Sequence, residues 1–424
     1  MNKKLKIGVL GAARGTCMIN ILSKHPEAEL AAVCDKYAPA LNEVKKNAEK
    51  NGIKLSCYNN FEDFLKADMD AVILANYAHQ HAPFAIRCLK AGKHVLSEVL
   101  PCATIAEGAA LIDAVEESRL IYAYAENYCY MQHHFEMWRR IKSGEIGEIS
   151  YAEGEYIHDC TSIWPRITYG DPMHWRNNMH TNFYCTHSLG PMLMAIDKRP
   201  VSVSGFDLPD YCRNGKVPET LGAGLMLVKL ENGAVCRALH GGLRRAEQPN
   251  DNYIYYGDLG TMETGRFSDA PVVNVYKEGE KYCHGEWERY NPKQFIKPKA
   301  EYKNPGHMGS DYYPTNFFIE KILGQKDGIE WSIDVYKAVE MGICGILAHR
   351  SVLNGNIPMK VPNLRNKSER NLYRNDCETT FPDIENGKLV SRRELPPARE
   401  RDEQFQKYIA GLWNEHAEFE KYPY

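Results

Sequence analysis

The 424-residue sequence predicts an α/β domain built on a doubly wound parallel sheet, followed by an α+β domain with an open, mainly antiparallel sheet. Three observations support this fold class. Apolar runs alternate with helical stretches over roughly the first 130 residues, which is typical of parallel sheets. Several apolar runs separated by turn signals follow, which is typical of antiparallel sheets. The length corresponds to two domains, or three, at roughly 100–200 residues each.

Composition and charge exclude several classes of protein. The chain is 44% hydrophobic and 25% charged, which argues against disorder. Its 52 basic and 55 acidic side chains leave a net charge of −3, so we expect no nucleic-acid partner. No stretch approaches roughly 18 consecutive apolar residues, so we expect no membrane span. The 13 cysteines lie scattered without metal-binding spacing, which favours reduced thiols in the cytoplasm.

The first element is a short apolar strand that ends at a glycine-containing turn, residues 11–16, and leads into a helix. Such turns carry the pyrophosphate of a dinucleotide, although a plain strand-to-helix turn is the alternative. The second strand ends at Asp35, close to the spacing of roughly 20 residues expected for a carboxylate that binds the adenosine ribose. A carboxylate repels a 2′-phosphate, so NAD is the predicted cofactor, and the neighbouring Lys36 weakens that preference. The cofactor-binding candidates here are Gly11, Ala13, Arg14, Gly15 and Asp35.

Two further strands complete the pattern of the first domain. Ala71–Ala75 is followed by Asn76 and a helix that reaches Leu89, and His94–Glu98 follows the helix stop at residues 91–93. Ligands of doubly wound sheets bind beyond the carboxyl ends of the strands. We therefore expect Asn76 and Glu98 to lie at the cofactor edge, together with Gly11 and Asp35.

These residues carry a resemblance. The runs 70–76, 81–83 and 91–98 together resemble the Gfo/Idh/MocA family of NAD(P)-dependent sugar and inositol oxidoreductases. The resemblance implies a Rossmann domain over residues 1–127 and adds His81 and Asn127 to the residues expected at the cofactor. In that family a Glu-Lys-Pro follows the fifth strand, and its lysine assists proton transfer at the oxidised carbinol. Here Val99 follows Glu98, so that lysine is absent.

Residues 128–362 are predicted to form the second domain. A helix with Phe135, Trp138 and Ile141 on one face ends at residues 143–144, and a strand follows at Ile149–Ile157. Further strands are predicted at Val201–Phe206, Gly224–Leu230, Ala234–Leu239, Tyr253–Gly257 and Val272–Tyr276, and helices at Asp311–Leu323 and Ser332–Leu353. Residues 363–424 read as an arm or tail that wraps the surface or a neighbouring subunit. The uncovered face of an open sheet predicts a homo-oligomer, either a dimer or a tetramer.

The segment from 156 to 191 is rich in histidine and aromatic residues and poor in aliphatic ones. No histidine pair has helical metal-binding spacing and no two cysteines accompany them, which argues against a metal site. One alternative is a surface loop whose aromatic rings pack on the sheet. We favour a binding loop, because long loops of this kind are usually functional and aromatic faces suit the apolar faces of sugars.

Four short pieces, 126–130, 156–159, 184–191 and 306–311, extend the resemblance to about residue 350. They are similar to the NAD-dependent glycosidase branch of the same superfamily, typified by glycoside hydrolase family 109, which also has valine at the position of Val99. The resemblance implies hydrolysis by transient oxidation at sugar C3, loss of the C2 proton, elimination of the aglycone, addition of water and return of the hydride. It implies catalytic roles for His187, Tyr184, Tyr130 and Glu98, and sugar contacts for His158, Trp164, Trp175 and His307.

Two other functions remain open. One is a sugar 3-dehydrogenase that releases NADH and a 3-keto sugar, and the other is a non-enzymatic sugar or nucleotide sensor on a retired dehydrogenase scaffold. The absent lysine and the 184–191 motif favour the hydrolase. Each catalytic candidate also has a purely structural interpretation. Glu98 would then only orient the nicotinamide ribose, Tyr130 would only pack, and His187 would cap a helix.

Overall fold

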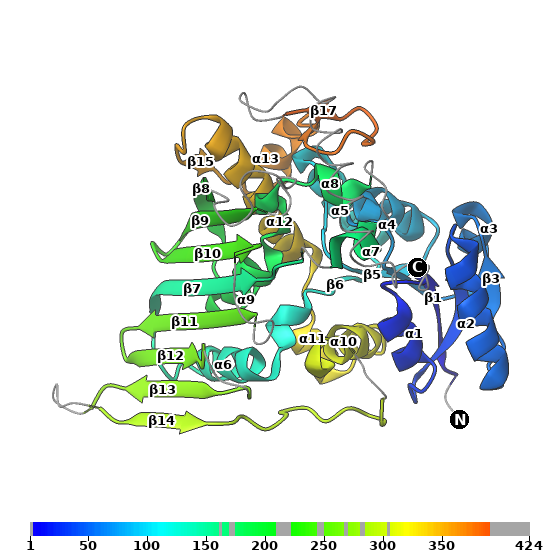
Figure 1. The fold of residues 1–424 in the computed structure, drawn as a ribbon, viewed down its shortest axis with the longest axis horizontal. Coiled ribbons are helices and arrows are strands. Elements are labelled where there is room, and N and C mark those ends of the chain that lie inside the picture. Colours follow the sequence, from blue (N-terminus) through cyan, green and yellow to red (C-terminus); the bar gives the residue numbers. More distant parts are fainter. Residues whose placement is uncertain are drawn as a thin grey trace.

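The computed structural model describes residues 3–160, 163–168, 174–208, 222–243, 250–266, 270–279, 285–302 and 306–390. Two large sheets organise these residues (Figure 1). The first is parallel and six-stranded, in the order β3-β2-β1-β4-β5-β6. Its strands are β1 (Leu5–Leu10), β2 (Ala28–Cys34), β3 (Ser56–Tyr58), β4 (Ala71–Leu74), β5 (His94–Ser97) and β6 (Tyr122–Tyr124). This is the strand order of a Rossmann fold, so the predicted fold class of the N-terminal part is confirmed.

Helices cover both faces of the first sheet because the side chains of its buried strands alternate between two apolar layers. Ile7 and Val9 face one layer with residues of α1 and α10, whereas Val72 and Leu74 face the other with residues of α4 and α5. The helices concerned are α1 (Thr16–Leu22), α2 (Ala38–Lys50), α3 (Phe61–Leu65), η1 (Ala78–Gln80), α4 (His81–Lys90), α5 (Ile105–Ser118) and α10 (Tyr312–Ile322). Thus α10, from late in the chain, completes the core of the first domain.

The second sheet has nine strands in the order β14-β13-β12-β11-β7-β10-β9-β8-β15. Its strands are β7 (Ile149–Ile157), β8 (Pro200–Leu208), β9 (Ala223–Leu230), β10 (Val235–Gly241), β11 (Asp251–Gly257), β12 (Gly260–Thr264), β13 (Val273–Lys277), β14 (Trp287–Tyr290) and β15 (Met359–Lys360). Only the β7–β10 pair is parallel among the described strands of this sheet, so the mainly antiparallel prediction is confirmed. One face packs on α6 (Gln132–Lys142), α9 (Thr186–Ile196) and α12 (Val335–Leu353).

Short elements connect the sheets and carry much of the chemistry. They are η2 (Asn127–Tyr130), α7 (Trp164–Thr168), α8 (Trp175–Asn178), η4 (Thr181–Tyr184), η7 (His307–Gly309) and α11 (Lys326–Trp331). The chain passes from the first sheet to the second between β6 and β7. The predicted domain boundary at residue 127 stays a prediction. In α12 the apolar stripe of Val335, Val339, Ile343 and Leu347 is buried in the core.

The described part of the predicted tail packs on its own chain. It contains α13 (Lys367–Leu372), β16 (Glu378–Thr379) and β17 (Lys388–Leu389), and residues 391–424 lie outside the described ranges. The fully buried Arg370 is paired with Asp113 and Glu116 of α5. Phe381 is also fully buried, against the ring of His79. Within the described ranges, none of the helices has the length and apolar character needed to cross a membrane.

Candidate active site

The turn after β1 is held in a shape that only glycine allows at its first position. Gly11 has φ +98°, and a Cβ there would lie 2.3 Å from the carbonyl oxygen of Ala75. Asp35, at the end of β2, accepts hydrogen bonds from the backbone N–H of Ala12 at 2.7 Å and of Tyr37 at 2.8 Å. The carboxylate therefore fixes the turn to the end of β2, at the carboxyl edge of the sheet.

Asn76 follows β4 beside this turn and has unused hydrogen-bonding groups. Both its Nδ2 and its Oδ1 are buried and without a hydrogen-bond partner. Buried amides in native proteins are almost always paired, so the free polar atoms of Asn76 fit a polar ligand at this edge of the sheet. The adjacent His81 differs, because its Nδ1 contacts the Leu100 carbonyl oxygen at 2.9 Å and its Nε2 the Asn76 carbonyl oxygen at 3.2 Å.

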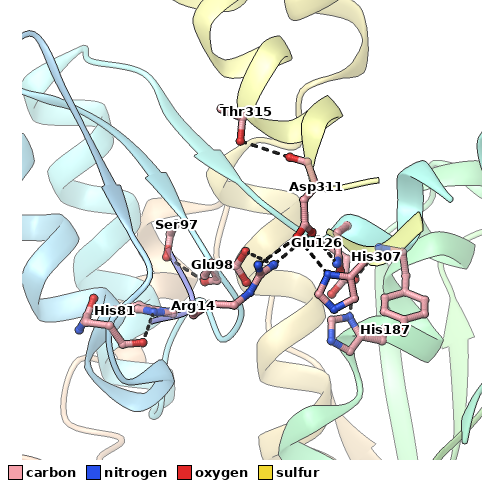
Figure 2. Close-up of polar contacts among 12 residues, drawn as sticks. Arg14, His81, Ser97, Glu98, Glu126, His187, His307, Asp311 and Thr315 are labelled. Carbon is pink, nitrogen blue, oxygen red and sulfur yellow. Dashed lines mark hydrogen bonds and ion pairs between the residues drawn. The ribbon is translucent and has the colours of Figure 1, made fainter. Parts of the chain in front are cut away.

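Arg14 joins the two domains at a buried junction of charges (Figure 2). Its guanidinium lies 2.6 Å from Glu98 Oε1 and donates to both oxygens of Asp311, at 3.0 and 3.1 Å. Asp311 is fully buried, and it also accepts hydrogen bonds from Asn127 Nδ2 at 2.9 Å and His307 Nδ1 at 3.0 Å. The surrounding positive charge, above all that of Arg14, outweighs burial and holds the pKa of Asp311 well below its usual range.

A second buried carboxylate orients His187. Glu126, after β6, accepts from His187 Nδ1 at 2.6 Å. A Cβ at Gly154 of β7 would lie 2.0 Å from the carbonyl oxygen of Ser188, so this glycine lets the start of α9 lie against the sheet. The hydroxyl of Tyr253 donates to the His187 carbonyl oxygen at 2.6 Å. His187 is thus held at both its ring and its backbone.

Three tyrosine rings surround the imidazole of His187. Their centroids lie 4.5 Å (Tyr128), 4.7 Å (Tyr156) and 5.0 Å (Tyr184) from it. Tyr128 donates to Asn250 and Tyr156 bonds to His158 Nδ1 at 2.9 Å, whereas the hydroxyl of Tyr184 has no hydrogen-bond partner among the described residues. Burial raises the pKa of Tyr184 above its ordinary value. Its hydroxyl is therefore neutral near pH 7 and available to a ligand.

Family comparisons agree with this arrangement. Residues 5–126 match the model of the Gfo/Idh/MocA oxidoreductase family with its NAD-binding Rossmann fold, and residues 268–370 match the C-terminal domain of glycosyl hydrolase 109. The chain is therefore similar to the Gfo/Idh/MocA family over its first domain and to glycosyl hydrolase 109 over part of its second. The resemblance predicted from short motifs is confirmed.

Curated relatives match this protein over most of its length. A glycosyl hydrolase family 109 protein of Solibacter usitatus is 27% identical, covering 85% of this chain and 88% of its own. One from Porphyromonas gingivalis is 24% identical, with 84% of each chain covered.

Solved structures share the fold. Scyllo-inositol dehydrogenase from Lactobacillus casei, with bound NAD(H) and scyllo-inositol, has a TM-score of 0.65 and 19% identity and covers 86% of this chain and 100% of its own. Levoglucosan dehydrogenase, in complex with NADH and levoglucosan, has a TM-score of 0.68 and 16% identity, with 85% and 100% covered.

The carboxyl edge of the first sheet fits NAD. The constrained Gly11 turn and the Asp35 carboxylate beside it are groups that a dinucleotide requires, and the unpaired amide of Asn76 lies next to them. Gly15 lies within the same turn, where its N–H donates to the Gly11 carbonyl oxygen, and Ala13 is exposed. Among the described residues no three His, Cys, Asp or Glu side chains are grouped to hold a metal ion.

The structure brings together Glu98, Tyr184, His187, His158 and His307. Burial lowers the pKa of His158, and the charges of His187 and His307 lower it further, so the three imidazoles are close enough to interact. The individual roles predicted for these residues, and the predicted contacts of Gly11, Gly15, Asp35 and Asn76 with the cofactor, stay predictions. Arg14 and Asn127 both donate hydrogen bonds to Asp311, so this carboxylate links the two side chains to the site.

For four predicted site residues the structure corrects the prediction. Their side chains are packed in the core or already hydrogen-bonded to other parts of the chain. Tyr130 is buried among Phe135, Trp138 and other rings, and its hydroxyl donates to the Trp331 carbonyl oxygen at 2.6 Å.

The other three corrections also follow from packing. His81 is buried with both ring nitrogens against backbone carbonyls, and burial lowers its pKa to about 4. Trp164 is 3% exposed, with its Nε1 donating to Asn177. Trp175 is 6% exposed, between His79 and the guanidinium of Arg176. Neither indole ring has a free face for a sugar.

The site also contains residues that were not predicted, namely Glu126, Tyr128, Tyr156 and Asp311. Each lies within a motif of the glycosidase resemblance, which was the available signal. Pairing Glu126 with His187 required knowing that β6 ends beside α9, 61 residues later. Sequence spacing does not show such long-range neighbours.

Proposed function

We propose that this protein is an NAD-dependent glycoside hydrolase. When bound, NAD⁺ supplies a hydride acceptor for sugar C3 and a hydride donor within the same turnover, so no second substrate is consumed. The likeness to glycosyl hydrolase 109 proteins supports the proposal. The observation that carries it is the Glu126–His187 pair beside Glu98, at a site where a buried valine, Val99, occupies the family's lysine position.

His187 acts as the base in this proposal. Because Nδ1 is bonded to the Glu126 carboxylate, the Nε2 atom is the one that faces a substrate proton. A buried carboxylate favours the imidazolium that forms when Nε2 takes that proton. The free, neutral hydroxyl of Tyr184 lies beside it and relays the C2 proton, passing its own proton to Nε2 of His187 as it accepts the proton from C2.

Arg14 and Glu98 position the reacting ring. The ion pair between them places a charged group at the end of β5, next to the expected nicotinamide. The Glu98 side chain is 7% exposed and that of Arg14 31%, so the carboxylate end of the pair is shielded from water, which strengthens its electrostatic effect on the sugar.

The alternative is a sugar 3-dehydrogenase that releases NADH. It is favoured by the fold shared with scyllo-inositol and levoglucosan dehydrogenases, which are described with NAD(H) or NADH and a polyol or sugar. The two reactions use the same oxidation at C3 and differ in whether the aglycone leaves.

A direct experiment separates these functions. The purified protein is analysed for bound NAD and then incubated with nitrophenyl glycosides of α and β configuration. Nitrophenol release without accumulation of NADH supports the hydrolase. Stoichiometric NADH without nitrophenol supports the dehydrogenase and overturns our proposal. Bound NAD with neither product favours a sensor.

Replacement of the proposed base gives a first mutational prediction. His187→Ala should lower kcat by about 10²-fold or more, since positioned acid–base groups contribute roughly 10²–10⁴-fold. The bound NAD content should be unchanged, because His187 bonds Glu126 and not the cofactor edge. Activity equal to that of the wild type would remove His187 from the mechanism.

The protein is also proposed to form a homo-oligomer, a dimer or tetramer, in the cytoplasm. Leu227 and Tyr256 are 40% and 42% exposed on the face of the second sheet that the helices leave uncovered. The cysteines of the described ranges are free thiols, which suits a reducing compartment. Light scattering coupled to size-exclusion chromatography tests the oligomeric state, and a monomer with the mass of one 48.3 kDa chain would contradict it.

A further inference from the structure

A second carboxylate–histidine pair lies next to the Glu126–His187 pair. His307 contributes its Nδ1 to a 3.0 Å hydrogen bond with Asp311 Oδ2, and its Nε2 has no partner among the described residues. Asp311 precedes α10 at the N-cap position but makes no capping bond with its side chain. The carboxylate instead accepts hydrogen bonds from side chains of the site, which is unusual for a residue type that commonly caps helices.

Asp311 is suited to support a protonated imidazole. Its pKa is held well below the ordinary value, mainly because Arg14 opposes the effect of burial, so the carboxylate is charged at any working pH. A charged acceptor at Nδ1 keeps the proton there and leaves Nε2 to exchange the second one. The same logic places Nε2 of His187 as the exchanging atom of the first pair.

The two imidazoles border one space. The ring of Tyr128 lies 4.5 Å from that of His187 and 6.4 Å from that of His307. Charges of both histidines also act to lower the pKa of Glu98, against the larger effect of burial, which raises it. In Figure 2 both imidazoles lie on the same side of the Arg14 junction. A sugar ring at Glu98 would therefore be bordered by two histidines with free Nε2 atoms.

Exposure distinguishes the two histidines. The side chain of His187 is 7% exposed, whereas that of His307 is 42% exposed. A group that takes protons from the sugar ring must reach the ring from inside the buried site, whereas the aglycone must leave toward solvent. His307 stands at the solvent side, where the leaving group is expected.

We propose that His307 is the catalytic residue that donates a proton from Nε2 to the leaving-group oxygen at C1, with Asp311 as its positioning residue. This rests on the proposed glycosidase function. In the sugar already oxidised at C3, the C2 proton goes to the His187–Tyr184 side and the C1–O bond breaks. Its electron pair stays on the aglycone oxygen, which takes the proton from His307. A water molecule then adds its oxygen to C1, its proton returns to His307 Nε2, and C2 regains a proton.

The backbone at this position is consistent with a functional constraint. His307 has φ +42° and Met308 φ +53°, in the left-handed region that non-glycine residues seldom adopt. Such conformations persist where surrounding contacts hold them and are frequent at active sites. Glycine takes this conformation without strain, so His307→Gly removes the imidazole while preserving the backbone path.

The test compares leaving groups. His307→Gln is assayed on nitrophenyl and methyl glycosides of the sugar that the wild type cleaves. Methoxide needs a proton to leave, so its release should fall by roughly 10²–10⁴-fold, while nitrophenol release should fall by less than about 10-fold. Exchange of the C2 proton with deuterated water, followed by NMR, should continue in the variant. Free imidazole should restore methyl glycoside hydrolysis in His307→Gly.

Each other outcome overturns the inference. An equal loss on both glycosides, or an unchanged rate on the methyl glycoside, shows that His307 is not the acid, provided that the variant retains bound NAD and its wild-type unfolding temperature. If His307→Gln does not fold, the imidazole response of His307→Gly decides alone, and no rescue overturns the inference. A wild-type protein that releases neither aglycone refutes the glycosidase function itself, which is a different failure.

Discussion

At the scale of single residues, the surroundings of a side chain decide its role more than its type. Tyr130 and Tyr184 both belong to motifs that resemble the glycosidase branch. The hydroxyl of Tyr130 is satisfied by the Trp331 carbonyl inside an aromatic core, whereas that of Tyr184 has no described partner beside His187. The motifs indicated which segments form the site. They could not indicate which tyrosine of a segment turns toward it, because that depends on the short η2 turn.

This difference predicts opposite effects of one substitution. Tyr184→Phe should lower kcat by roughly 10²-fold, because a proton-transfer group is lost, with little change in stability. Tyr130→Phe should leave kcat unchanged and lower the free energy of unfolding by about 1 kcal/mol, the net worth of one hydrogen bond. Steady-state kinetics and urea denaturation of both variants are the measurements. A large kcat loss in Tyr130→Phe would contradict the assignment.

At the scale of elements, strongly patterned segments were predictable and short ones were not. The predicted strand at 149–157 has the bounds of β7, and the long helices α10 and α12 lie where periodicity placed them. The strands β12 and β14 and the helix α11 were missed. β14 has an exposed Trp287 on an edge strand, so its sequence lacks the alternation that a half-buried strand shows.

The start of α5 gives a pH-dependent prediction. Glu107 N–H donates to Thr104 Oγ1, and Glu107 Oε2 accepts from the N–H of Ala103, the residue before the N-cap, in a variant of the capping box. Burial raises the pKa of Glu107 to about 7. The folded state therefore binds this proton more tightly than the unfolded state, and stability is lost as the pH rises from about 4.5 through about 7.

Glu107→Gln should remove that loss, because glutamine keeps an acceptor for Ala103 without ionising. The stability of the variant relative to the wild type should increase from pH 4.5 to pH 8, by at most about 1.4 kcal/mol per pH unit. Denaturation curves across this range measure it, with Glu117→Gln on the exposed side of the same helix as the control. A difference that stays constant with pH would contradict the prediction.

At the scale of the whole molecule, the fold class followed from the sequence but the long-range pairings did not. Alternation of strands and helices suffices to predict the parallel sheet. The pairs Arg14–Asp311 and His79–Asp383 join residues 297 and 304 positions apart, and no local pattern relates them. The segment 363–390 was predicted only as an arm, and the structure shows that it packs on both domains.

This packing predicts a matched pair of variants. Arg370→Ala should lower the free energy of unfolding by about 3 kcal/mol, because it leaves Asp113 and Glu116 without a fully buried partner. Arg374→Ala, whose side chain is 42% exposed and also pairs with Asp113, should cost less than about 1 kcal/mol. Equal effects of the two substitutions in guanidinium denaturation would contradict a structural role for the segment.

The pairing of Arg14 with Asp311 also has a consequence for how the chain matures. A ribosome that adds roughly 5–20 residues per second needs on the order of 15–60 s to make the stretch between these two residues. Throughout that interval the arginine of the glycine turn has only Glu98 of its two carboxylate partners, and α10, which completes the core of the first domain, has not been synthesised. The cofactor edge of the first sheet is therefore finished late in synthesis, although its strands are made first.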